Sequence, residues 1–130
     1  MQNEWRRAAV EGDAGLMERL LVEAEAIDSR DRYGQTALML AAVHGHAAVI
    51  DLLIARGADL DVTGKHGLSA LMLAIVNGHA EIALTLIEAG ANTGLRGTGA
   101  PGFAGRTAGD LARERDFHDI AEAIARRTQG

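Results

Sequence analysis

Three glycines near the end of the chain match the spacing of a phosphate-binding loop. Gly97, Gly99 and Gly102 follow the pattern G-x-G-x-x-G, which in dinucleotide-binding proteins lets the backbone approach a pyrophosphate. That chemistry requires a buried strand before the glycines and a helix that opens directly after them. Here a helix stop and a polar turn precede the glycines, and Pro101 interrupts them. The sequence therefore predicts no dinucleotide site and no bound cofactor.

The five histidines do not have the arrangement of a metal site. His46 and His79 each follow a glycine at equivalent positions of a repeated pattern, which indicates a structural role. His44, His66 and His118 have no i, i+4 partner of ligand type and no local cluster with metal spacing. We therefore expect no bound metal ion, and we interpret His44 and His66 as surface contact residues.

The carboxylates and hydroxyls also lack a catalytic arrangement. Asp28, Asp31, Asp59 and Asp61 fall at expected turns, where aspartate side chains cap their own backbone. Neither of the two serines has the context of a nucleophile elbow, and the sequence contains no cysteine. The sequence therefore predicts a protein that is not an enzyme.

The elements that hold these residues come from one pattern that is written twice between residues 34 and 93. Subtraction places Gly34 and Gly67 33 residues apart, and the same offset pairs Gly57 with Gly90. Self-similarity at one fixed period is the signature of a repeat protein.

Each copy has the features of a helix–turn–helix unit. In the first copy, Thr36 can cap a helix over residues 37–44, Gly45 ends that helix, and a second helix follows over residues 47–56. Both helices are shorter than the 12 to 15 residues or so at which an isolated helix becomes marginally stable in water. Each unit must therefore bury its apolar face on the next unit.

This pattern resembles the ankyrin repeat. The resemblance implies an all-α solenoid of four stacked helix–turn–helix units with projecting β-turn loops, over residues 1–30, 31–63, 64–96 and 97–130. The family motif T-P-L-H appears here as TALM and SALM, so a histidine that ties turns together in this family is methionine, and we expect looser connections between turns. The residues that carry the resemblance, with their second-copy partners, are Gly34, Thr36-Ala37-Leu38, Leu40-Ala41-Ala42, Gly45-His46, Leu52-Leu53 and Gly57-Ala58-Asp59.

The first and last units are expected to be end caps. Both place charged side chains on their outer surface, as an end cap requires, and this suggests a complete protein of four units. We interpret Trp5 as a residue that closes one end of the core.

A glycine-rich insertion lengthens the third turn. The offset from Gly67 to Gly105 is 38 residues, five more than the period, and the additional residues fall within 95–105. Glycine is typical of flexible loops, so one interpretation is an elongated flexible turn. The alternative is an adaptable finger that carries Phe103 to a partner, because long loops are often functional.

Composition argues against several classes of protein. The net charge of −5 argues against general binding to nucleic-acid phosphates. No apolar run is long enough to cross a bilayer, and the first ten residues lack the apolar core of a signal peptide. We therefore expect a cytoplasmic protein that binds neither nucleic acid nor membrane. Lys65 is the only lysine beside twelve arginines, which is typical of a bacterial protein from a GC-rich genome.

The residues that differ between copies predict where a partner binds. Core positions recur at the period, whereas contact positions need not, and proteins of the resembled family commonly bind through turn tips and the ends of first helices. The predicted contact residues are Arg32, Tyr33, Gln35, Val43 and His44 in the second unit, Lys65, His66, Leu68, Val76 and Asn77 in the third, and Phe103 and Arg106 in the last.

The chemistry of this set predicts the kind of partner. Basic side chains follow the turns of a chain that is acidic overall, which favours an acidic protein partner. Tyrosine and arginine are also frequent anchors of interfaces. We therefore predict a non-enzymatic protein–protein interaction module, a regulator, adaptor or inhibitor, that is more often a monomer than a dimer. The alternative is a self-associating scaffold protein whose apolar contact residues pack in a dimer.

Overall fold

The computed structural model describes residues 2–22 and 26–129 of the chain. Over these residues the secondary structure is helical, apart from one isolated bridge between Gly97 and Ala104. A short 3-10 turn, η1, spans Lys65–Gly67. The α-helices are α1 (Asn3–Glu11), α2 (Ala14–Val22), α3 (Ala37–His44), α4 (Ala47–Ala55), α5 (Ala70–Val76), α6 (Ala80–Glu88), α7 (Ala108–Glu114) and α8 (His118–Gln129).

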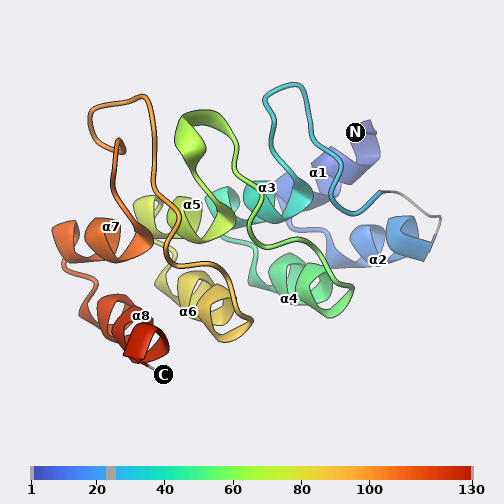
Figure 1. The fold of residues 1–130 in the computed structure, drawn as a ribbon. Coiled ribbons are helices and arrows are strands. Elements are labelled where there is room, and N and C mark those ends of the chain that lie inside the picture. Colours follow the sequence, from blue (N-terminus) through green and yellow to red (C-terminus); the bar gives the residue numbers. More distant parts are fainter. Residues whose placement is uncertain (1, 23–25, 130) are drawn as a thin grey trace.

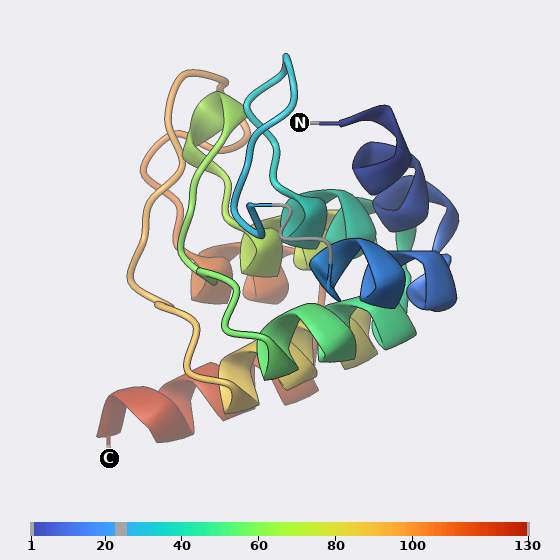
Figure 2. The ribbon, with the colours of Figure 1, turned by 90° about the vertical axis from the view of Figure 1, so that its right-hand side faces the viewer.

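The helices form two layers of a curved stack. The first helices of the pairs, α1, α3, α5 and α7, stand side by side in one layer, and α2, α4, α6 and α8 form the other (Figure 1). Long turns connect one pair to the next and project from one edge of the stack (Figures 1 and 2). The two termini lie at opposite ends (Figure 1). The predicted all-α solenoid of helix pairs is confirmed.

Helix α3 shows why the pattern folds in this way. The side chain of Thr36 accepts a hydrogen bond from the backbone N–H of Met39 at 3.3 Å, as expected of a helix cap. The six residues from Ala37 to Ala42 are all buried, because α3 contacts α1, α4 and α5. A short helix that is apolar all round is stable only when other helices surround it.

The repeated Gly-His pairs join neighbouring units. His46 Nε2 lies 2.7 Å from the carbonyl oxygen of Val10, and His79 Nε2 lies 3.0 Å from that of Val43. Each imidazole therefore donates to a carbonyl in the last turn of the preceding first helix, where no intrahelical partner is available. The predicted structural role of His46 and His79 is confirmed.

The last unit lacks this histidine. With the 38-residue offset of the insertion, Asp116 takes the position of Gly78 and Phe117 takes that of His79. Asp116 keeps the left-handed conformation, with φ of 60°. A Cβ atom built on Gly78 would meet no other atom within 4 Å, whereas one built on Gly45 would lie 2.7 Å from the ring of His79.

Aspartate side chains connect the bases of neighbouring turns. Asp28 Oδ1 accepts from the backbone N–H of Asp59 at 2.9 Å, and Asp61 Oδ1 accepts from that of Asn92 at 2.8 Å. These bonds connect turns in which the family histidine is replaced by methionine. Whether the connections are looser than in an array with that histidine stays a prediction.

Large side chains hold the first and the last helix pair in place. Trp5 is completely buried, and its Nε1 has no hydrogen-bond partner among the described residues. Its predicted role in closing the core is confirmed. At the other end, Arg127 donates from Nε and Nη2 to the carbonyl oxygen of Ile87, at 3.0 and 2.6 Å, and so holds α8 on the C-terminus of α6.

Candidate functional site

The first turn (residues 28–33) is held in shape by one buried carboxylate. Asp31 Oδ1 accepts from the backbone N–H groups of Tyr33 and Gln35, at 2.9 and 3.0 Å. Its Oδ2 accepts from Nε of Arg6 in α1, and the Asp31 side chain is only 4% exposed. Burial alone would raise the pKa of this carboxyl, but the hydrogen bonds from Gln35, Arg6 and Tyr33 outweigh it and hold the pKa below its ordinary value.

This turn presents two predicted contact residues to solvent. Tyr33 is 61% exposed, which is unusual for a large apolar side chain in this protein. The guanidinium carbon of Arg32 lies 5.3 Å from the centroid of the Tyr33 ring, within the range of a cation–π contact. Gln35, a predicted contact residue that follows this turn, is half-buried, and its backbone closes the turn onto Asp31.

The predicted contact residues in and just after the second turn (residues 61–66) are divided between surface and core. Lys65 is exposed and His66 is half-buried. His66 has a left-handed backbone, with φ of 62°, which is uncommon outside glycine. The prediction for Leu68 places it wrongly, because Leu68 is 5% exposed and packs in the core. The turn passes inward at this residue to reach α5, so an apolar side chain is buried there.

The third turn (residues 94–104) is closed by backbone hydrogen bonds and contacts the second turn. The backbone N–H of Gly97 donates to the carbonyl of Arg106 at 2.9 Å, and Gly105 donates back to Gly97 at 2.9 Å. The N–H of Thr98 donates to the carbonyl of His66 at 2.7 Å. The Phe103 ring lies 5.8 Å from the ring of His66. The second and third turns therefore form one block, in which Phe103 supports His66.

The other predicted residues lie at the far ends of the first helices. Val43 and His44 end α3, and Val76 ends α5, followed by Asn77. The turns precede the starts of the same helices, so the two groups are separated by about 12 Å, the length of an eight-residue helix. The structure thus divides the predicted site into two regions.

His44 is the titratable group of the helix-end region. Its ring is stacked beside that of His46, with 6.4 Å between the centroids. Partial burial lowers the pKa of His44, and the positive charges of His46, Arg6 and His79 lower it further. At the end of α5, Asn77 donates from Nδ2 to the carbonyl of Leu73 at 2.8 Å, so one donor of its amide is already engaged within the protein.

Arg106 is paired within the protein. Its Nε donates to both carboxylate oxygens of Glu114, at 2.8 and 3.1 Å. The positive charge that the sequence placed at this position is therefore compensated by a carboxylate on α7. Arg106 contributes less to the charge of the turns than predicted.

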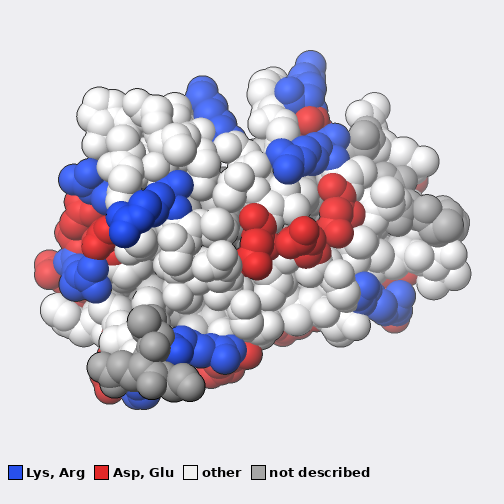
Figure 3. Space-filling view, viewed as in Figure 1, with Lys and Arg blue, Asp and Glu red and all other residues white. Residues whose placement is uncertain are grey.

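Four other cations on the turns have no such partner in the part of the chain that the structure describes. Among the described residues, no carboxylate lies within 4.0 Å of these four side chains, whereas six arginines elsewhere form ion pairs. Figure 3 shows the basic side chains along the projecting turns and a row of acidic side chains below them. The exposed carboxylates at the turn bases are Asp28, Asp59 and Asp61. The four unpaired cations, called the turn cations below, are Arg30, Arg32, Lys65 and Arg96.

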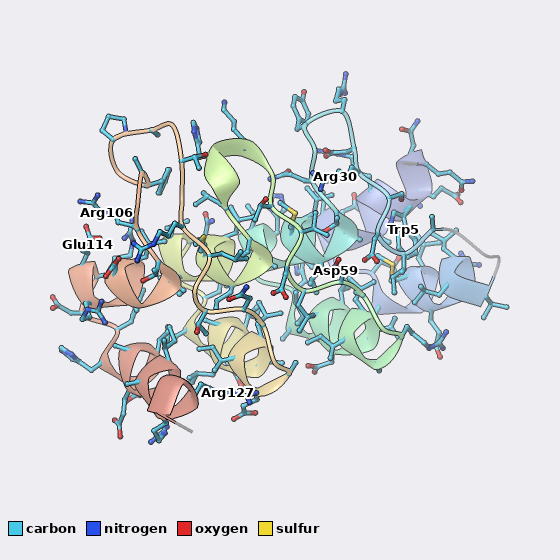
Figure 4. The ribbon with its side chains drawn as sticks, viewed as in Figure 1. Trp5, Arg30, Asp59, Arg106, Glu114 and Arg127 are labelled. Carbon is cyan, nitrogen blue, oxygen red and sulfur yellow. The ribbon has the colours of Figure 1, made fainter. Side chains whose placement is uncertain are left out.

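Two of the turn cations are fixed by backbone carbonyls. Arg30 Nη1 donates across to the carbonyl of Thr63 in the second turn at 3.0 Å (Figure 4). Arg96 Nη1 donates to the carbonyl of Gly105 at 2.7 Å. The sequence places both arginines among the basic side chains of the turns, but they were not among the predicted contact residues. They occupy equivalent positions, two periods apart, on either side of Thr63.

A groove on the described surface lies away from the turns. A groove of about 600 Å³ runs between α6 and α8, with Leu84, Ile87 and Ala123 among its lining residues. Its rim holds the Glu122–Arg126 ion pair. In the described part of the chain, no three His, Cys, Asp or Glu side chains gather closely enough to hold a metal ion. None of the described helices has the length and apolar character to cross a bilayer.

Comparison with known proteins agrees with this architecture. A family model for ankyrin repeats, in three copies, matches residues 6–96. No curated protein matches the sequence.

A solved structure shares the fold over nearly the whole chain. It is the complex of a predatory endopeptidase from Bdellovibrio bacteriovorus with an immunity protein, and the similar chain is the ankyrin-type immunity protein. The TM-score is 0.86 at 27% sequence identity, over 97% of this chain. The match spans 64% of the length of that chain.

Proposed function

The chain belongs to the ankyrin repeat family, and we propose that it is a non-enzymatic module that binds a protein partner with an acidic surface through its turns. The observation that carries this proposal is the set of turn cations, which have no carboxylate partner among the described residues although the chain is acidic overall. Complementary charge would speed the encounter with an acidic partner and suppress association with other proteins.

Tyr33 supplies the apolar part of this proposed interface. Its ring is largely exposed beside Arg32, and tyrosine and arginine are the side chains most often found at interface hot spots. Asp31 holds the turn below them, so little conformational entropy would be lost on binding.

The role that we favour is inhibition of a partner enzyme. The support is the fold shared with an immunity protein that was solved in complex with an endopeptidase. At 27% identity, this likeness supports a class of role and not the same partner. The inhibitor would be cytoplasmic and would act as a monomer, which light scattering on the purified protein can test.

The proposal is tested by capturing the partner from the native lysate and then measuring the affinity of the purified partner for the protein. We expect Arg32→Gln together with Tyr33→Ala to weaken binding by about 2 kcal/mol or more, as hot-spot substitutions do. Arg126→Gln is the matched control, because it removes an exposed arginine that is ion-paired on α8. Equal affinity of the double variant and the wild-type protein, with unchanged folding, would show that the partner binds elsewhere.

A further inference from the structure

The turn cations form two pairs, and the members of each pair occupy equivalent positions of the repeat. Arg32 and Lys65 are one period apart, and Arg30 and Arg96 are two periods apart. We propose that these turn cations bind an extended acidic segment of the partner, an inference that rests on the proposed function. The segment would cross the first and second turns, with its carboxylates spaced to match the repeat.

The spacing of the turns suits an extended chain. Stacked helices lie about 8 to 10 Å apart, and each turn leads into one of these helices. A polyproline II chain has three residues per turn and rises about 3.1 Å per residue, so every third side chain shares one face at about 9 Å. Carboxylates at every third residue would therefore meet Arg32 and Lys65 in succession.

The structure holds part of this cationic row in place before any ligand binds. Arg30 bridges from the first turn to the carbonyl of Thr63, and Arg96 closes the third turn onto Gly105. Carbonyl oxygens orient a guanidinium without neutralising its charge, so both arginines keep charge for an anionic partner. Groups ordered in advance lose less entropy when they bind.

The second turn also has a fixed shape. His66 accepts a hydrogen bond from Thr98 and packs against Phe103, and Lys65 is its neighbour in the chain. Figure 3 shows the turns as two lobes, with basic side chains on each. A segment that crosses from one lobe to the other would meet positive charge on both.

The acidic row at the turn bases favours a peptide over a nucleic acid. Asp28, Asp59 and Asp61 are exposed at the turn bases, and Figure 4 shows Asp59 below Arg30. A continuous chain of phosphates binds by neutralising many charges at once, and these carboxylates would repel it. A short acidic segment can lie along the turn tips and leave the row uncovered.

The test uses synthetic peptides and amide resonances of the full chain. The probe is a peptide of four Glu-Pro-Pro triplets, and its neutral counterpart has Gln-Pro-Pro triplets. A third peptide has the composition of the probe with its four glutamates adjacent. We expect the probe to shift the amide resonances of residues 30–35 and 63–68, to bind more tightly than the peptide with adjacent glutamates, and to lose affinity at high salt.

Variants separate the turn cations from general charge. We expect Arg32→Gln with Lys65→Gln to weaken binding of the probe by about tenfold, the effect of one or two exposed charge contacts, and Arg126→Gln to leave it unchanged. Equal binding by the double variant would overturn the proposal. Tighter binding of a single-stranded oligonucleotide than of the probe would overturn it too.

The outcomes also distinguish this inference from the proposed function. If a purified protein partner loses affinity for the double variant while the wild-type protein never binds the probe, the extended segment is wrong and the binding module stands. If the probe binds and no turn variant changes the affinity for the captured partner, the turn cations are a peptide site and the proposed protein interface is wrong.

Discussion

Arg6 in α1 donates from Nε to Oδ2 of Asp31 in the first turn, over 3.1 Å. This bond joins the first unit to the turn that carries Arg32 and Tyr33. The equivalent positions of the second and third turns are Gly64 and Gly97. The first turn is thus shaped by a side chain that these two turns lack.

The Asp31 carboxylate should make the protein less stable as the pH falls into the acid range. The folded state holds its pKa below the ordinary value through bonds from Gln35, Arg6 and Tyr33, despite burial. Its contribution is therefore present above the ordinary pKa of about 4 and is lost as the pH falls through the lower folded value. We expect Asp31→Asn to reduce the free energy of unfolding at pH 7 by about 1 to 3 kcal/mol.

Urea unfolding at several pH values measures this effect. The variant should lose less stability than the wild-type protein as the pH falls below about 4. Asp51→Asn, on the exposed side of α4, is the control and should be nearly neutral at pH 7. Parallel acid dependence of Asp31→Asn and the wild-type protein would contradict the role given to Asp31.

Two glycines of equal conformation should differ in their response to alanine. Gly45 and Gly78 have φ of 77° and 79°, so alanine at either position adds about 1 to 2 kcal/mol of backbone strain. At Gly45 the new methyl group would also press on the His79 ring, whereas Gly78 has open space. Gly45→Ala should therefore destabilise the protein more, by urea unfolding, and equal losses would show that the ring moves freely.

His79 should contribute to the stacking of the units. Its Nε2 donates to the carbonyl of Val43, and removing the ring would leave that carbonyl without this partner. We expect His79→Ala to reduce the free energy of unfolding by about 1 to 3 kcal/mol. His118→Ala, at an exposed position on α8, should change the unfolding midpoint little. If His79→Ala leaves the free energy of unfolding unchanged, water replaces the imidazole as the hydrogen-bond donor without loss of stability.

Phe103 should hold the second and third turns together. Its ring packs on His66, whose carbonyl accepts from Thr98. We expect Phe103→Ala to increase hydrogen exchange at the Thr98 amide while the amides of α5 stay protected. Pro101→Ala, at an exposed position in the same turn, is the matched control. Unchanged exchange at Thr98 would show that the backbone bonds alone fix the block.

His44 should make the folded state sensitive to mild acid. Partial burial and the charges of His46, Arg6 and His79 depress its pKa in the folded state. Its contribution is present above the ordinary value of about 6.5 and is lost as the pH falls toward the lower folded value. The unfolding midpoint of His44→Gln should therefore fall less between about pH 7 and pH 5, the range in which an imidazole gains its proton, than that of the wild-type protein. An identical fall would assign the sensitivity to other groups.

The sequence determined the repeat, the helices and the side chains that join one unit to the next. Thr36 caps its helix, and His46 and His79 bond the preceding unit, because these contacts recur at the period and depend only on local order and stacking. Trp5 was also predictable, because an end unit needs a large apolar side chain to close the core.

Tertiary structure alone decided which turn residues keep a free charge or a free ring. Leu68 enters the core, Arg106 pairs with Glu114, and Phe103 packs on His66. These contacts depend on the path of the turns and on the insertion, which breaks the period and so removes the register that made the helices predictable. Periodic burial specifies how units stack, whereas partners within irregular turns are fixed only when the chain closes in three dimensions.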